Sequence, residues 1–199
     1  VLKFMNRKEF EEQLMQNETI EATVAFIDIC KFTSISETES ADKVVKLLNS
    51  YFDVIVKSII AQSGYIDKFI GDCVMAVFKG EFHLDRAIEA CINLRNEIER
   101  FPEEAVENIH FFPKVSIGIN SGEMVSGNIG SAQLRRLDYT VIGDTVNVAQ
   151  RLQSAASDGQ ILITEASFHQ VKESFNCNRI GELQLKHKTA PIVVYEVKD

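Results

Sequence analysis

The sequence predicts an α/β sandwich with a mixed sheet, and three observations support this prediction. Short apolar runs of strand length alternate with longer segments whose apolar residues recur at helical spacing. Hairpin signals interrupt the alternation, most clearly at Gly71-Asp72, and they favour a mixed sheet over a doubly wound parallel one. The 199 residues, 45% of them hydrophobic, fit one large domain with a sizeable core.

The first half of the chain divides into elements at clear changes of period. In order, we expect a short helix over 6–16, a strand over 22–29, a helix from Ser40 to Gly64, two strands over 64–78 and a helix over 83–100. Gly64 is a typical helix terminator, and Pro102 stops the last helix of this set.

The second half contains more glycine and shorter elements. We expect strand–turn–strand over 113–130, a short strand leading into a helix over 139–156, a strand and a helix over 159–171, and a closing pair of strands over 181–197.

Charge and cysteine content exclude several functional classes. The net charge of −8 disfavours broad nucleic-acid binding, which needs a basic face. No run of 18 apolar residues is present, so no membrane span or membrane contact is expected. Four scattered cysteines without a CxxC pair indicate reduced thiols and a cytoplasmic location. The start at Val1 fits a fragment, with residues 1–20 as a helix and linker from an upstream regulatory region and 21–199 as the catalytic domain.

Asp28 and Asp72 are the first candidates for chemistry. Asp28 ends an apolar strand, where a lone carboxylate is unfavourable, and Asp72 lies at a hairpin tip. If the two strands pair, the carboxylates converge, and a divalent cation such as Mg²⁺ relieves their repulsion. Such a site suits two-metal phosphoryl chemistry. The alternative is that Asp28 caps the next helix and Asp72 is a turn residue.

Three further segments carry polar groups of the kinds that take part in binding or catalysis. The segment 29–34 offers backbone amides before a helix, a natural anion site. Asn147 and Arg151 lie four residues apart on a predicted helix, where an amide and a guanidinium can orient a ribose and stabilise a phosphate. Lys68 stands in an otherwise apolar strand. The alternatives are an ordinary helix junction, a solvated helix face and a surface lysine.

These segments together resemble the catalytic domain of class III nucleotidyl cyclases. The motifs FIDICKFT, KFIGDCVMAVF, GINSGEMVSGNIGS and YTVIGDTVNVAQRL have that family's order and spacing, and GELQLKHKTAPIVVYEV is similar to its last strands. The resemblance covers about residues 21 to 197. It implies a ferredoxin-like βαββαβ core and a head-to-tail homodimer with catalytic sites at the interface. The implied reaction converts a nucleoside triphosphate to the 3′,5′-cyclic monophosphate and pyrophosphate.

The resemblance also implies roles for individual residues. Asp28, Asp72 and the Ile29 carbonyl match the ligands of two Mg²⁺ or Mn²⁺ ions, and Phe32 and Thr33 match the phosphate-binding turn. Asn147 matches the asparagine that orients the ribose, and Arg151 matches the arginine that stabilises the transition state. In such dimers the aspartates come from one chain and Asn147 and Arg151 from the other.

Base choice is expected to depend on Lys68 and Thr140. Lys68 matches the lysine typical of adenylyl cyclases, and its ammonium donates to adenine N1, whereas guanine N1 is itself a donor. Thr140 stands where many adenylyl cyclases carry aspartate; the threonine is similar to the class IIIb subgroup, whose members include bicarbonate-responsive enzymes. ATP is therefore the expected substrate, with bicarbonate as a candidate activator.

The sequence departs from the family pattern in two places. His187 replaces the usual glycine in the terminal loop, where Lys186 is the candidate triphosphate contact. Glu123 stands where some members carry a phosphate-binding arginine. The competing functions are a guanylyl cyclase, a catalytically silent dimerisation module and a polymerase palm. Lys68 argues against a guanylyl cyclase. The intact set of catalytic residues argues against a silent module, and the acidic net charge argues against a polymerase palm.

Overall fold

The computed structural model describes residues 17–100, 113–131, 136–184 and 190–199. These residues form one eight-stranded sheet and five helices. The strands are β1 (Glu18–Ile29), β2 (Tyr65–Ile70), β3 (Cys73–Lys79), β4 (Val115–Ser131), β5 (Arg136–Ile142), β6 (Ile161–Thr164), β7 (Cys177–Leu183) and β8 (Ile192–Val197). The helices are α2 (Phe32–Thr38), α3 (Ala41–Ala61), α4 (His83–Glu99), α5 (Asp144–Ala155) and α6 (Glu165–Val171).

The sheet is mixed and mainly antiparallel, as predicted. Its strands run in the order β2-β3-β1-β4-β6-β8-β7, with β5 paired to β4 off this path. Among the described strand pairs only β4–β6 is parallel. The order β2-β3-β1-β4, with helices between β1 and β2 and between β3 and β4, is the ferredoxin-like core that the family resemblance implies.

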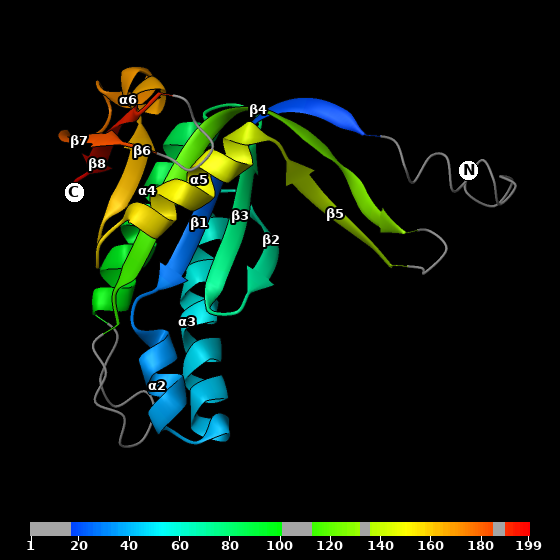
Figure 1. Ribbon diagram of the computed structural model, residues 1–199, viewed down its shortest axis with the longest axis vertical. Helices are drawn as coiled ribbons and strands as arrows, with labels where there is room; N and C mark the ends of the chain where they lie inside the picture. Colours follow the sequence, from blue (N-terminus) through cyan, green and yellow to red (C-terminus); the bar gives the residue numbers. More distant parts are fainter. Residues whose placement is uncertain (1–16, 101–112, 132–135, 185–189) are drawn as a thin grey trace, which may run out of the picture.

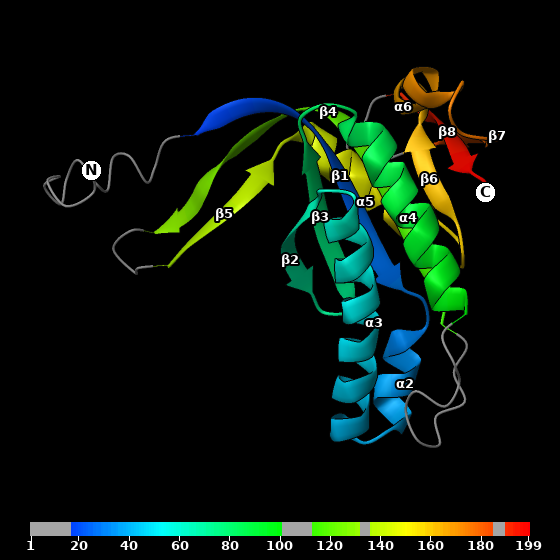
Figure 2. The same cartoon turned by 180° about the vertical axis from the view of Figure 1, so that it is seen from behind.

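The central strand β1 explains the apolar run that precedes Asp28. Helices α3 and α4 cover one face of the sheet, and α5 crosses the other (Figures 1 and 2). Ala25 and Ile27 belong to the buried cluster under α3 and α4, whereas Val24 and Phe26 belong to the cluster on the α5 face. Because both faces are covered, residues 24–27 are apolar at every position instead of alternating.

The expected strand–turn–strand over 113–130 is wrong, because this segment forms the single long strand β4. The first part of β4 pairs with β1 and the last part with β5. The glycines that predict a turn in the sequence lie within this continuous strand, and Gly118 allows close packing. A Cβ at Gly118 would collide with the backbone of α5 at Ala149 and Gln153, so glycine lets this helix lie directly on the sheet.

Other boundaries differ less. A separate seven-residue helix, α2, precedes the helix expected from Ser40, and β1 begins at Glu18 instead of residue 22. Ser40 is the N-cap of α3, as the change of period predicts. The expected helix over 6–16 lies outside the described residues.

The end of β4 and its partner β5 project from the body of the sheet (Figures 1 and 2). We call this segment, Val125–Ser131 with Arg136–Ile142, the β4–β5 arm. Ile129, Tyr139 and Ile142 on the arm are exposed large hydrophobic residues, as are Phe69 and Ile70 on the neighbouring edge strand β2.

The described residues also show the state of the cysteines and the character of the helices. All four cysteines are free thiols. None of the helices described is long and apolar enough to cross a membrane.

Candidate active site

The ends of β1 and β3 bring Asp28 and Asp72 together. The two strands pair in antiparallel register with Asp28 opposite Cys73, so Asp72 is the next residue along, in the β2–β3 turn. Burial, and to a lesser extent the charge of the nearby Asp72, raise the pKa of the Asp28 carboxyl to about 6. The predicted convergence of the strands is therefore confirmed, and Asp28 is not the N-cap of α2, whose capping residue is Lys31.

This pair of carboxylates fits a divalent cation. No cluster of three or more acidic, histidine or cysteine side chains occurs in the described part of the chain. Mg²⁺ commonly binds through one or two carboxylates together with substrate phosphate and water, so a larger protein cluster is unnecessary. The mutual repulsion that raises the Asp28 pKa is the interaction that a bound cation reverses. Ile29 ends β1 directly after Asp28, which leaves its backbone carbonyl at the same strand end.

The turn after β1 is shaped by packing. Lys31 adopts a left-handed backbone conformation with φ 64°, and α2 begins at the next residue. Phe32 is buried with Ile29, Leu47 and Tyr51, whereas Thr33 is exposed. The Phe32 side chain therefore anchors the turn, and only its backbone is available to a phosphate.

A second group of polar side chains joins β2 to β5. The Lys68 Nζ donates to Thr140 Oγ1 at 3.0 Å, and Thr140 is buried. Thr140 Oγ1 in turn donates to Asp67 Oδ2 at 2.8 Å, and Lys68 Nζ lies 3.2 Å from the same oxygen. Lys68 is thus part of a hydrogen-bonded cluster rather than a solvated surface lysine.

Asp67 is the member of this cluster that sequence reasoning missed. Strict alternation in a strand directs neighbouring residues to opposite faces, so Asp67 and Lys68 are not expected to meet. The pairing of β2 with β3 shifts register between Ile66 and Lys68, which leaves Asp67 as the extra residue of a β-bulge. Bulges re-aim side chains, and this one lets both residues reach Thr140. The nearest sequence signal is the charged pair Asp67-Lys68 inside an apolar strand.

The third group lies on α5. Asn147 is exposed and Arg151 is half-buried, and the two are one helical turn apart. No hydrogen bond or ion pair among the described residues links either side chain to the aspartate pair or to the Lys68 cluster. One chain therefore presents these predicted residues as separate groups. Lys186 lies outside the described residues.

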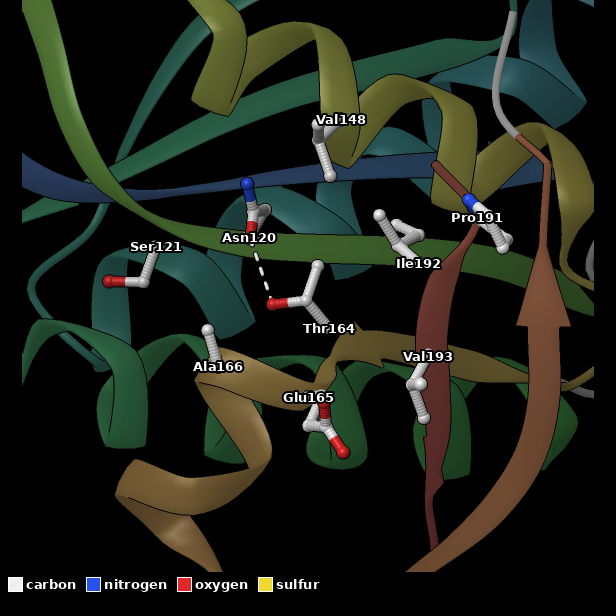
Figure 3. Close-up of a pocket in the computed structure, with 9 residues that line it drawn as sticks. All are labelled: Asn120, Ser121, Val148, Thr164, Glu165, Ala166, Pro191, Ile192 and Val193. Carbon is white, nitrogen blue, oxygen red and sulfur yellow. Dashed lines mark hydrogen bonds between the residues drawn. The ribbon is translucent and has the colours of Figure 1, made fainter. Parts of the chain in front are cut away.

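Two cavities differ in how they lie relative to these groups. A polar pocket of ≈ 400 Å³ is lined by Asp67, Lys68, Phe69, Asp138 and Tyr139, next to the Lys68 cluster. A second one of ≈ 450 Å³ lies between α5, β4, the start of α6 and β8, and none of the predicted site residues that the structure describes is among its lining residues (Figure 3). In this second cavity the Asn120 side chain accepts a hydrogen bond from Thr164 Oγ1 and donates one to the Thr145 carbonyl. Both ends of its amide group are therefore already bonded within the protein.

With this geometry in place, comparison with known proteins is decisive. Residues 14–198 match the family described as the adenylate and guanylate cyclase catalytic domain. The chain belongs to this family. It is a class III nucleotidyl cyclase domain, as the sequence motifs indicate.

Two similar curated proteins are adenylate cyclases. The chain is 36% identical to an adenylate cyclase of Anabaena cylindrica over 88% of its length and 32% identical to adenylate cyclase 1 of Rhizobium meliloti over 89%. It spans only 36% and 27% of those two relatives.

Similar solved structures include both adenylyl and guanylyl cyclases. The adenylyl cyclase CyaB of P. aeruginosa superposes with a TM-score of 0.87 at 33% identity, covering 93% of this chain and 97% of that one. The guanylyl cyclase Cya2 superposes with a TM-score of 0.83 at 29% identity, covering 92% and 93%. The cyclase fold therefore leaves the base to be argued from the site.

Because burial and Asp72 raise the Asp28 pKa, we expect Asp28→Asn to stabilise the metal-free protein at neutral pH. The folded state holds the Asp28 proton more tightly than the unfolded state, so the carboxylate destabilises the fold above about pH 6. This penalty shrinks as the pH falls from about 6 towards the ordinary value of 3.8. Melting temperatures across this range measure it.

Asp53→Asn, a matched change at an exposed position of α3, should leave the melting temperature unchanged at each pH. Saturating Mg²⁺ should cancel the advantage of Asp28→Asn, because the cation stabilises only the protein with the carboxylate. A variant no more stable than the parent at pH 7.5 without metal would contradict the raised pKa.

Proposed function

We propose that this domain is an adenylyl cyclase, which converts ATP to 3′,5′-cyclic AMP and pyrophosphate in a homodimer. The observation that carries the choice of ATP is the hydrogen bond from Lys68 to Thr140. It places an ammonium donor beside a hydroxyl oxygen, and Lys68 lines a polar pocket. Adenine offers an acceptor at N1 and a donor at its 6-amino group, which matches this pair; guanine offers the opposite at both positions.

The chemistry divides among the three groups of side chains. Asp28, Asp72 and the Ile29 carbonyl would hold two Mg²⁺ or Mn²⁺ ions, which when bound lower the pKa of the ribose 3′-hydroxyl and offset the triphosphate charge. The turn at Phe32 and Thr33, with Lys186, would contact the triphosphate. Asn147 orients the ribose so that its 3′-oxygen lies in line with the α-phosphate.

Arg151 acts on the phosphate as charge develops. Its guanidinium donates to the oxygens of the α-phosphate, and this interaction strengthens as the 3′-oxygen attacks and pyrophosphate departs. Within the described residues no carboxylate pairs with Arg151, so its charge is available to a ligand.

The separation of these groups within one chain supports a composite site in a dimer. A second copy would bring the α5 of one chain to the aspartates of the other. The exposed apolar residues of β2 and the β4–β5 arm lie beside the Lys68 cluster and form the expected contact surface. Burying such residues is the main source of affinity in a protein interface.

To test the activity, cyclic AMP and cyclic GMP should be measured after incubation of the purified chain with ATP or GTP, in Mg²⁺ and in Mn²⁺. Cyclic AMP from ATP is the expected product, and added bicarbonate tests the proposed class IIIb response. Cyclic GMP as the main product would overturn the base assignment. No product from a sample shown to be dimeric would favour a regulatory module.

We expect Ile70→Glu to convert the dimer to monomer and to remove most activity at micromolar protein concentration. Ile70 is 46% exposed on the edge strand β2, and a carboxylate there would be buried by the second copy. Analytical ultracentrifugation and an activity assay measure the two effects.

The matched control is Val45→Glu, which alters a residue 55% exposed on α3 outside this surface. It should dimerise and turn over like the parent. If Ile70→Glu remained fully dimeric, the proposed surface would be wrong.

A further inference from the structure

Asp67 has a burial and bonding pattern that its place in the fold does not explain. Its side chain is 0% exposed, and its Oδ1 is buried with no hydrogen-bond partner among the described residues. A buried carboxylate with one unpaired oxygen destabilises a fold, so its presence calls for a role other than stability. Its other oxygen, Oδ2, contacts both Thr140 and Lys68.

The contact with Thr140 fixes the direction of a hydroxyl proton. A threonine hydroxyl has a single proton, and two acceptors lie within reach here. Asp67 Oδ2 is 2.8 Å from Thr140 Oγ1, whereas the Val141 carbonyl is 3.5 Å away. The shorter, charge-assisted bond prevails, so the Thr140 proton points to Asp67. The side of Thr140 Oγ1 that remains is an acceptor only.

Lys68 and Thr140 do not use all of their hydrogen-bonding capacity within the cluster. Thr140 Oγ1 has two lone pairs, and Lys68 occupies one at 3.0 Å. Lys68 has three N–H donors, of which Thr140 and Asp67 receive two. The cluster is left with one free donor on Lys68 and one free acceptor on Thr140.

We propose that Asp67 is a positioning residue that sets base specificity by holding the Thr140 hydroxyl as an acceptor. Without it the hydroxyl is ambivalent: it can accept from the 6-amino group of adenine or donate to O6 of guanine. With it, only the adenine edge is complementary to Thr140 and Lys68 together. Asp67 also lines the polar pocket of ≈ 400 Å³ in which a base would lie. This inference rests on the proposed function and adds a third residue to its base recognition.

The test compares Asp67→Asn with the parent chain, using the ratio of kcat/KM for ATP to kcat/KM for GTP in Mn²⁺. The introduced amide has nearly the same shape, but it can donate to Thr140 and so release the hydroxyl to face either base. We expect the ratio to fall roughly tenfold, the size of one redirected hydrogen bond in a binding pocket. Asp53→Asn on the exposed face of α3 makes the same charge change elsewhere and should leave the ratio unchanged.

A double-mutant cycle separates positioning from a general structural effect. Asp67 acts through the Thr140 hydroxyl, so Asp67→Asn should have no further effect on the ratio in a Thr140→Val background. An unchanged ratio in Asp67→Asn would overturn the inference, as would an equal loss in both backgrounds. If Asp67→Asn does not fold, Thr140→Val alone decides: it must also lower the ratio.

The inference and the proposed activity fail in different ways. If the parent chain forms no cyclic nucleotide, the proposed activity is wrong. The Asp67 inference is then decided by equilibrium binding of ATP and GTP to the same intact chains in Mn²⁺. A parent preference for ATP that Asp67→Asn lowers would support it, and equal preferences in the two proteins would overturn it.

Discussion

Mixing the Asp72→Ala chain with the Arg151→Ala chain is expected to restore cyclase activity that each chain lacks alone. In the proposed dimer each site takes its aspartates from one chain and Asn147 and Arg151 from the other. A mixed dimer then has one site with both changes and one site with none. If the subunits exchange at random, half of the dimers are mixed. Each mixed dimer has one intact site of two, so about a quarter of the parent activity should return.

Each single variant should retain at most about a hundredth of the parent turnover, far below the activity expected of the mixture. Asp72→Ala removes one of two adjacent carboxylates, and the remaining Asp28 is half-buried without a second acidic ligand. The control mixes Asp28→Ala with Asp72→Ala, which place both defects on the same half of the site and should not complement. If mixed dimers form and remain inactive, while the parent is active, the shared-site arrangement is wrong.

The aspartate site was predictable because it depends on a regular pattern. The apolar run of 22–29 and the hairpin signal at Gly71-Asp72 predict the strand ends that carry Asp28 and Asp72. The sequence leaves open whether the two strands pair, and the antiparallel pairing of β1 with β3 in the structure places Asp72 beside Asp28.

The base-recognition cluster was only half predictable because it depends on irregular structure. The motif resemblance identified Lys68 and Thr140, but their link through Asp67 requires a bulge whose position no periodicity marks. The misread segment 113–130 has a related cause. Glycine is equally a signal of a turn and of close packing, and at Gly118 the packing of α5 decides.

Arg151→Ala is expected to lower kcat by roughly 10²–10³-fold while changing KM for ATP only a few-fold, the pattern for loss of a group that stabilises developing charge. The asymmetry follows from position. Arg151 lies one helical turn from Asn147 on α5, whereas the contacts that hold the base come from β2 and β5. Ground-state binding therefore depends little on Arg151. Steady-state kinetics in Mn²⁺ measure both constants.

Two companion variants separate charge from geometry. Arg179→Ala removes an exposed arginine of β7 that pairs only with Glu182 among the described residues, and it should change neither constant. Arg151→Lys keeps the charge but loses the planar fork that contacts two phosphate oxygens at once, so it should recover only part of kcat. An increase in KM equal to the loss in kcat would assign Arg151 to substrate binding instead. Full recovery by lysine would show that charge alone suffices, and the developing phosphate charge would then need no bidentate contact from α5.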